Sequence, residues 1–238
     1  MPRRPAMARL DELIETATQI FLQKGYRRTQ MADVTQAMGL SPGAVYRYVE
    51  SKEALFDLVI RAAAPPGVTP ADLTLPLPTP PPGATLAFLR QVLQHEGRLL
   101  ALEAALTRTT VDDPHAELAQ ILRELYTLIA RHHRGIKMVE RSALDWPDLA
   151  VLWFGEVRQR LLDSCTHYLT LRLHHGLLRP MPDVTAAARL IIETTAFFAL
   201  HRHYDPYPTT LDDALAEETV VDALINAYAL KAEGRTSS

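Results

Sequence analysis

A proline-dense stretch divides this chain and excludes a single continuous helical or sheet domain. Residues 64–82 (APPGVTPADLTLPLPTPPP) contain eight prolines. Because proline lacks a backbone N–H and fixes φ, neither a helix interior nor a central strand tolerates this density. We therefore expect an extended, partly polyproline surface connector between two folded parts. A peptide-recognition site is the alternative interpretation of the same composition.

The segments on either side of the proline stretch are helical in pattern. Apolar residues recur at helical spacing over residues 8–63 and again over 83–233, and no segment shows sustained strand-like alternation. Only ten glycines occur in 238 residues. The sequence therefore predicts an all-α protein.

Composition and charge narrow the class of protein. With 47% hydrophobic and 22% charged residues the chain is an ordinary globular protein, and no apolar run reaches the ~18 residues of a membrane span. We identify no signal peptide, and Cys165, the only cysteine, cannot form an internal disulfide, so a cytoplasmic protein is expected. The net charge is −3, yet residues 1–61 carry nine Lys/Arg against seven Asp/Glu. This asymmetry suits a protein that contacts DNA with one end.

The N-terminal part predicts short helices separated by tight turns. A first helix has one apolar face and stops at Gly25; its apolar residues are Leu10, Leu13, Ile14, Ala17, Ile20 and Phe21. Thr29 is the expected N-cap of a short helix through Met38. Gly39-Leu40-Ser41 is a tight turn, and a third helix runs over Pro42–Val49.

Two short helices joined by a three-residue turn with glycine are typical of a helix-turn-helix, whose second helix enters the major groove. Residues on that helix, or at helix starts where backbone N–H groups favour phosphate, are the predicted DNA contacts. They are Arg28, Thr29, Ser41, Gly43, Tyr46, Arg47, Tyr48 and Lys52.

The run TQMADVTQAMGLSPGAVYRYVESKEAL, residues 29–55, resembles the DNA-binding head of the TetR/AcrR regulators. The likeness covers roughly residues 9–60 without a gap. Thr35 and Val49 depart from the family's usual alanine and phenylalanine. The resemblance implies a three-helix DNA-binding domain over 1–63, the connector over 64–82, and a helical ligand-binding and dimerisation domain over 83–238. It also implies a transcriptional regulator, by family habit a repressor that a ligand releases from its operator.

The second part predicts five long helices, over 84–109, 113–134, 147–175, 183–204 and 210–232. Polar or aromatic side chains placed within apolar helix faces are what a largely apolar ligand pocket needs for orientation. The alternative is that these residues are ordinary core. The predicted ligand-binding residues are His95, Glu96, Tyr126, Trp153, Phe154 and Tyr168.

The last two predicted helices, 183–204 and 210–232, are apolar on more than one side. A two-fold interface between two copies of the chain would bury the surplus, and a two-fold dimer would require a near-palindromic double-stranded DNA operator. The alternative is that both helices are interior.

Other functions have weaker support in the sequence. Adjacent histidines such as His174-His175 point to different helix faces, so we expect no metal site, although a metal-responsive regulator stays an alternative. We assign Arg172 and these histidines to a helix C-terminus. No catalytic or phosphate-loop motif is found, so we expect neither an enzyme nor a cofactor. A DNA-binding regulator without a small-molecule effector is a further alternative.

Finally, the sequence suggests how a ligand would act. An unknown, largely apolar effector would bind among helices 84–109, 113–134 and 147–175. Helix 51–63, which continues into the proline connector, would carry the motion to the head.

Overall fold

The computed structural model describes residues 6–65, 67–68 and 73–230, and within these ranges the chain is helical. This part has no strand, and two isolated bridges pair Val49 with Leu77 and Leu178 with Ala229. The all-α prediction is therefore confirmed. No helix in these ranges is long and apolar enough to cross a membrane.

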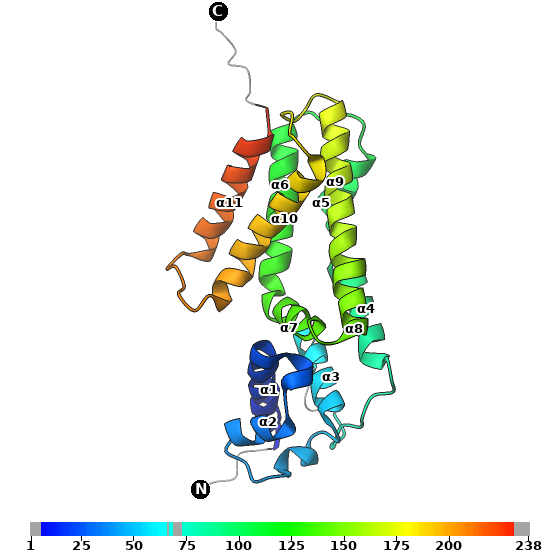
Figure 1. Cartoon of the computed structure of the whole chain (residues 1–238), viewed down its shortest axis with the longest axis vertical. Coiled ribbons are helices and arrows are strands. Elements are labelled where there is room, and N and C mark those ends of the chain that lie inside the picture. Colours follow the sequence, from blue (N-terminus) through cyan, green and yellow to red (C-terminus); the bar gives the residue numbers. More distant parts are fainter. Residues whose placement is uncertain (1–5, 66, 69–72, 231–238) are drawn as a thin grey trace, which may run out of the picture. The chain divides into compact units, whose positions relative to one another are not determined.

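The described residues form two compact units (Figure 1). The first unit takes in Met1–Gly97 and Arg134–Glu156, and the second Arg98–His133 and Val157–Ser238. The units therefore do not follow chain order, because residues 84–96 and 134–156 group with the N-terminal helices. The division into a DNA-binding domain over 1–63 and a ligand-binding domain over 83–238 concerns function and stays a prediction.

The N-terminal part of the first unit has α1 packed against α2 and α3. In the order of the chain they are α1 (Ala6–Arg28), α2 (Met31–Ala37), η1 (Ala44–Arg47), α3 (Lys52–Ala63) and α4 (Ala84–Glu96). Helix α3 also packs on α4. The predicted apolar face of α1 is buried at Leu10, Leu13, Ala17 and Phe21.

A helix that the sequence analysis did not predict, α7 (His133–Ala143), completes the first unit with α8 (Pro147–Ala150) and most of the π-helical η3 (Val151–Arg158). The buried Ser142 hydroxyl accepts the Tyr26 N–H at 3.1 Å. Gly25, expected to end the first helix, instead lies at a kink within α1 with φ 76°. A Cβ there would lie 3.0 Å from the Arg141 carbonyl oxygen, so glycine serves both the backbone conformation and the close approach of α7.

The second unit is a bundle in which α10 is central. Its elements are α5 (Leu100–Thr107), α6 (Pro114–Arg131), α9 (Gln159–His174), α10 (Val184–Ala199), η4 (His201–Tyr204) and α11 (Asp213–Tyr228). Helix α10 packs on α6, α9 and α11, and α5 packs on α6 and α9. Figure 1 shows α10 between α11 and α9.

The five predicted long helices are each shorter than expected or interrupted. The 84–109 segment breaks into α4 and α5, because Gly97 ends α4 and Leu99 has extended backbone. The 113–134 segment ends at Arg131, and the 147–175 segment contains the π-helical η3. The 183–204 segment ends as α10 at Ala199 and continues as the 3-10 turn η4, and the last helix spans only Asp213–Tyr228.

Candidate nucleic-acid interface

The turn between α2 and η1 has the hydrogen bonds of a Schellman motif. The Gly39 N–H donates to the Gln36 carbonyl at 3.0 Å, and the Leu40 N–H donates to the Thr35 carbonyl at 2.9 Å. Gly39 has φ 62°, the left-handed conformation that the motif requires. The predicted tight turn is therefore confirmed, and it fixes the direction in which the chain leaves α2.

The predicted α-helix over Pro42–Val49 is wrong in kind, because the structure has only the four-residue 3-10 turn η1. Gly43 precedes it with φ 80°, and the Tyr46 N–H donates to the Gly43 carbonyl at 3.1 Å. A left-handed residue cannot continue an α-helix, so helical structure begins only after it. A Cβ on Gly43 would meet nothing within 4 Å, which makes backbone conformation the reason for glycine.

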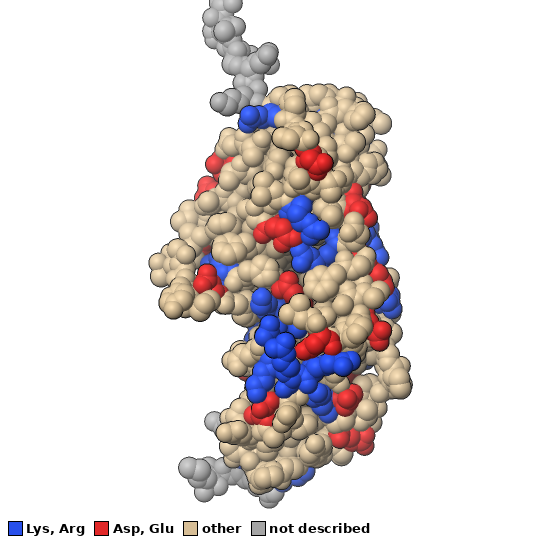
Figure 2. Space-filling view, in the orientation of Figure 1, with Lys and Arg blue, Asp and Glu red and all other residues tan. Residues whose placement is uncertain are grey.

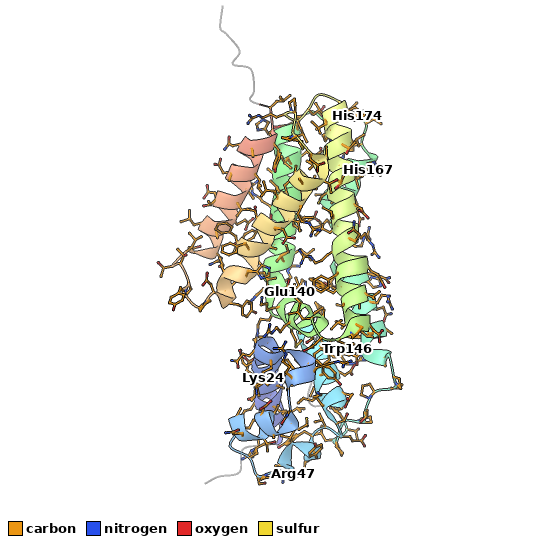
Figure 3. All side chains as sticks on the ribbon, viewed as in Figure 1. Lys24, Arg47, Glu140, Trp146, His167 and His174 are labelled. Carbon is orange, nitrogen blue, oxygen red and sulfur yellow. The ribbon has the colours of Figure 1, made fainter. Side chains whose placement is uncertain are left out.

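The 3-10 geometry of η1 decides which side chains are exposed. Residues three apart eclipse one another in a 3-10 helix, so Val45 and Tyr48 share the buried side, at 1% and 8% exposure. Tyr46 is 49% exposed, and Arg47 is exposed with its Nε 3.4 Å from the Ala44 carbonyl oxygen. Figure 3 shows Arg47 at the outer edge of the first unit. Of the three side chains predicted on this face, Tyr46 and Arg47 are exposed and Tyr48 is not.

Thr29 is also buried, and the prediction that it caps α2 is wrong. Its side chain is 1% exposed, and its hydroxyl donates to the Gly25 carbonyl of α1 at 2.7 Å. The N-cap is Gln30, whose N–H donates to the Asp33 carboxylate at 2.9 Å. Thr29 therefore holds the end of α1, and sequence reasoning missed this because threonine at either helix end has the same local pattern.

The other predicted DNA contacts differ in exposure and in the interactions that their side chains make. Ser41 and Gly43 are exposed in the turn. Arg28 is 63% exposed, with its Nε 3.4 Å from the Asp145 carboxylate. Lys52 is more engaged: its Nζ donates to the Arg27 carbonyl at 3.3 Å and lies 4.6 Å from the centroid of the Tyr26 ring.

An aromatic cluster joins the helices that carry this surface. The ring of Tyr26 lies 4.7 Å from that of Trp146 and 4.9 Å from that of Phe56, centroid to centroid. The Tyr26 hydroxyl donates to the Glu53 carboxylate at 2.8 Å. Burial, and then the Glu53 carboxylate, raise the pKa of Tyr26, whereas the same hydrogen bond is the main cause that lowers the pKa of Glu53. The cluster fixes α1, α3 and Trp146 to one another.

Several basic side chains of the first unit form ion pairs. Figure 2 shows Lys and Arg gathered with Asp and Glu among them. Lys24 lies 2.8 Å from Asp33, and Arg134 lies 2.7 Å from Glu15. Pairing of this kind limits non-specific attraction for a polyanion, so recognition depends more on the few exposed groups around η1.

The structure does not bring the six predicted ligand-binding residues into one unit. Four of them lie in the first unit, where His95, Glu96 and Phe154 are exposed and Trp153 is buried. Tyr126 on α6 and Tyr168 on α9 lie in the second unit, and both are buried. The exposure of His95 and Glu96 follows from the end of α4 at Gly97, since both lie in its last turn. Among the described residues, no three His, Cys, Asp or Glu form a group that could hold a metal ion.

A buried ion pair near Tyr168 was missed by the sequence analysis, which assigned Arg172 to a helix C-terminus. The Arg172 side chain is 0% exposed and donates to the Glu117 carboxylate at 2.6 and 2.9 Å. It also donates to the Ala105 carbonyl at 2.7 Å, so the C-terminus that it serves belongs to α5 rather than to its own helix. Burial raises the pKa of Tyr168, and the Glu117 carboxylate adds to the effect. Burial alone raises the pKa of the Cys165 thiol, to about 12.

The C-terminal helices carry exposed apolar side chains. Leu190 and Phe197 on α10 are 56% and 46% exposed, and Leu215 on α11 is 52% exposed. Such side chains on two neighbouring helices are the surface that the sequence analysis expected to find in a dimer.

Comparison with known proteins identifies the N-terminal region. The profile of the family described as "Bacterial regulatory proteins, tetR family" matches residues 13–59. The chain is 36% identical over 61 residues to the uncharacterized HTH-type transcriptional regulator YfiR of Bacillus subtilis, a match that covers 26% of this chain and 30% of YfiR. It is 34% identical over 53 residues to the HTH-type transcriptional repressor KstR2 of Rhodococcus jostii, covering 22% and 26% of the two chains. The chain thus matches less than a third of the length of these relatives.

Solved structures resemble the chain over nearly all of its length. The ketosteroid transcriptional regulator KstR2 of Mycobacterium tuberculosis aligns with a TM-score of 0.58 at 18% identity, covering 94% of this chain and 96% of that one. The TetR family transcriptional regulator PfmR of Thermus thermophilus aligns with a TM-score of 0.52 at 20% identity, covering 94% and 97%. At these identities the likeness shows the fold alone.

Proposed function

Because the chain belongs to the tetR family of bacterial regulatory proteins, we propose that it is a homodimeric transcriptional repressor that binds a near-palindromic DNA operator and is released by a small, largely apolar ligand. The observation that carries the DNA-binding part is the exposure of Tyr46 and Arg47 on η1, directly after a rigid turn. The word "repressor" in the name of the KstR2 relative supports repression.

The DNA face proposed here follows the exposure of each side chain. Arg47 reads a base edge or a phosphate, and the Tyr46 hydroxyl does the same beside it. Ser41 and Gly43 allow close approach of the backbone, and Arg28 and Lys52 contact phosphates.

Thr29 and Tyr48, being buried, keep a place in this proposal as supports of the surface. Thr29 does so through the end of α1. Tyr48 does so through the buried side of η1.

The dimer would use the exposed apolar side chains of α10 and α11. Burial of apolar area at roughly 25 cal/mol per Å² is the main source of association free energy for such a surface. A Leu190→Glu/Phe197→Glu variant is expected to be monomeric in light scattering at micromolar concentration, where the wild type is a dimer. A wild-type monomer under the same conditions would contradict the dimer.

The effector site is proposed in the second unit, near Tyr126 and Tyr168. In the described part of the chain the buried Thr195 hydroxyl has no hydrogen-bond partner, and a buried polar group without a partner costs free energy. A polar group on an otherwise apolar ligand would supply that partner. This site does not include the four predicted ligand contacts that lie in the first unit, His95, Glu96, Trp153 and Phe154.

Operator binding is tested with two exposed arginines. Arg47→Ala is expected to weaken binding to a selected operator by about 1–3 kcal/mol, because it removes a direct contact. Arg160→Ala, which removes an exposed arginine from α9, is the control and is expected to leave affinity unchanged. Equal affinity for wild type and Arg47→Ala, in fluorescence anisotropy on the same duplex, would remove η1 from DNA recognition.

Release by a ligand is tested separately. A compound that co-purifies with the protein or raises its melting temperature is titrated against the operator complex, and a 10- to 100-fold loss of affinity needs only ~1.4–2.8 kcal/mol of coupling. Tight binding without any change in operator affinity would favour a DNA-binding regulator that has no effector.

A further inference from the structure

The proline-rich connector is hydrogen-bonded to the DNA-binding region over part of its length. We call residues 75–80, Leu-Pro-Leu-Pro-Thr-Pro, the proline strap. Its N–H donors lie only at Leu75, Leu77 and Thr79, because proline has none. In extended chain, N–H groups two residues apart point to the same side. At Leu77 and Thr79 this places both donors on one edge of the strap, and Pro78 between them has none.

The donors of Leu77 and Thr79 meet the segment that follows η1. The Leu77 N–H donates to the Tyr48 carbonyl at 2.8 Å, and the Glu50 N–H donates to the Leu77 carbonyl at 2.9 Å. The Thr79 N–H donates to the Glu50 carboxylate at 3.0 Å, and the Thr79 hydroxyl donates to the Ser51 hydroxyl at 2.8 Å. Four hydrogen bonds thus join Leu77 and Thr79 to residues 48–51.

Residues 48–51 are the joint between two short elements. Tyr48 is the C-cap of η1, and Ser51 is the N-cap of α3, with its hydroxyl accepting the Ala54 N–H at 3.1 Å. A four-residue 3-10 turn has few hydrogen bonds of its own, so its angle to α3 depends on what holds the joint. Val49 within the joint is 0% exposed and pairs with Leu77 in the parallel bridge.

From these contacts we infer that the proline strap is a positioning element for DNA recognition: Leu77 and Thr79 hold the joint between η1 and α3 and so aim Tyr46 and Arg47 at the bases. The inference rests on the proposed DNA binding by η1. Prolines suit this role because fixed φ angles lower the entropy lost when the strap is ordered. At Pro78 the outer edge of the strap also has no donor, so no further strand can pair there.

The role differs from the one expected from sequence, in which helix 51–63, continuing into the connector, carries motion to the head. Hydrogen bonds from Leu77 and Thr79 attach this part of the connector to the head itself. The strap then affects the sequence specificity of DNA binding and has no part in ligand-induced release.

The test separates sequence-specific from non-specific binding. Positioning affects contacts to base edges, whereas contacts to phosphates tolerate small shifts in η1. Thr79→Val removes the hydroxyl and keeps the N–H, and Glu50→Ala removes the acceptor of that N–H. We expect each to lower the ratio of operator affinity to affinity for an unrelated duplex by roughly 2- to 10-fold, the effect of losing one hydrogen bond, with unrelated-duplex affinity unchanged.

Matched variants control for charge and composition. Because Glu50→Ala also removes a negative charge, it is compared with Glu50→Gln, which removes the charge and keeps an acceptor oxygen and is expected to keep the ratio. Thr74→Val, at an exposed threonine of the same connector, is expected to change nothing. Thr79→Ser, which keeps the hydroxyl, should restore the ratio.

Two results would overturn the inference. One is an unchanged ratio in both Thr79→Val and Glu50→Ala, and the other is an equal loss of affinity for the two duplexes, which indicates general destabilisation. A wild-type protein that binds neither duplex would instead show that the proposed function is wrong, so the two failures are distinguishable.

Discussion

The two compact units hold their interiors together with different chemistry. The first unit is closed by aromatic rings, with Tyr26 between Phe56 and Trp146, and its charged side chains pair at the surface. The second unit encloses a complete ion pair, Arg172 with Glu117, at 0% and 7% side-chain exposure. Loss of one ring removes packing contacts, whereas loss of one partner of a buried ion pair also leaves the other charge without compensation. The second unit is therefore the more sensitive to single substitutions.

The largest expected effect comes from breaking the buried pair. Arg172→Met leaves the Glu117 carboxylate and the Ala105 carbonyl without their donor, and we expect the free energy of unfolding to fall by about 3–5 kcal/mol. Urea denaturation followed by circular dichroism measures it. Arg179→Met, at an exposed arginine, is the control.

The double variant Arg172→Met/Glu117→Leu sharpens this result. It removes both charges, so it should recover much of the stability lost in the single variant. A single variant as stable as the wild type would contradict the view that the second unit depends on this pair.

The aromatic cluster of the first unit predicts a smaller effect. Trp146 is half-buried, and Trp146→Ala removes its contacts with Tyr26 and Phe56, which we expect to cost about 2 kcal/mol. Trp146→Phe keeps a ring and should recover more than half of that loss in the same denaturation experiment. If Trp146→Ala lowers the free energy of unfolding as much as Arg172→Met does, the two units do not differ in their sensitivity to substitution.

A substitution at Thr195 in α10 is expected to raise stability instead of lowering it. Its side chain is 0% exposed, and its hydroxyl has no hydrogen-bond partner among the described residues. Thr195→Val keeps the shape and removes the unsatisfied group, so we expect stability to rise by about 1 kcal/mol. If the hydroxyl serves the proposed effector, the same variant should bind that compound more weakly. Loss of stability in Thr195→Val would indicate that the hydroxyl has a partner.

Local patterns in the sequence predicted the head better than the second unit. The apolar face of α1 and the turn at Gly39 follow from spacing and from glycine conformation, which depend on near neighbours only. Tyr48 was misassigned because a four-residue 3-10 turn and an α-helix have the same sequence signature, yet they point the fourth residue in different directions. Thr29 was misassigned because its partner, the Gly25 carbonyl, belongs to the preceding helix.

Long-range contacts explain features of both units that the sequence could not predict. Arg172 and Glu117 are 55 residues apart, and nothing local marks either as buried. The break at Gly97 was missed because apolar spacing continues across it, and α7 was missed because Gly135, which lies inside it, has the sequence signature of a helix stop. The proline stretch predicts a connector, but the hydrogen bonds between Leu77 and the segment after η1 required the fold to bring the two segments together.

The smallest expected effect is a pH dependence at His203 in the second unit. Burial, and then the Arg202 guanidinium, lower the pKa of His203. The His133 ring lies 5.0 Å away, while the Asp213 carboxylate, 3.8 Å from Nε2, is already paired with Arg202. A histidine whose pKa is lower in the folded than in the unfolded protein favours the neutral form. Its contribution to stability is therefore complete above the unfolded value of about 6.5 and is lost as the pH falls toward the folded value.

We accordingly expect the urea midpoint of His203→Asn to fall less between pH 7.5 and 5.5 than that of the wild type. His167→Asn, at an exposed histidine of α9 (Figure 3), controls for the loss of one imidazole ring and should follow the wild type. A steeper fall in His203→Asn would mean that Asp213 stabilises the protonated ring after all.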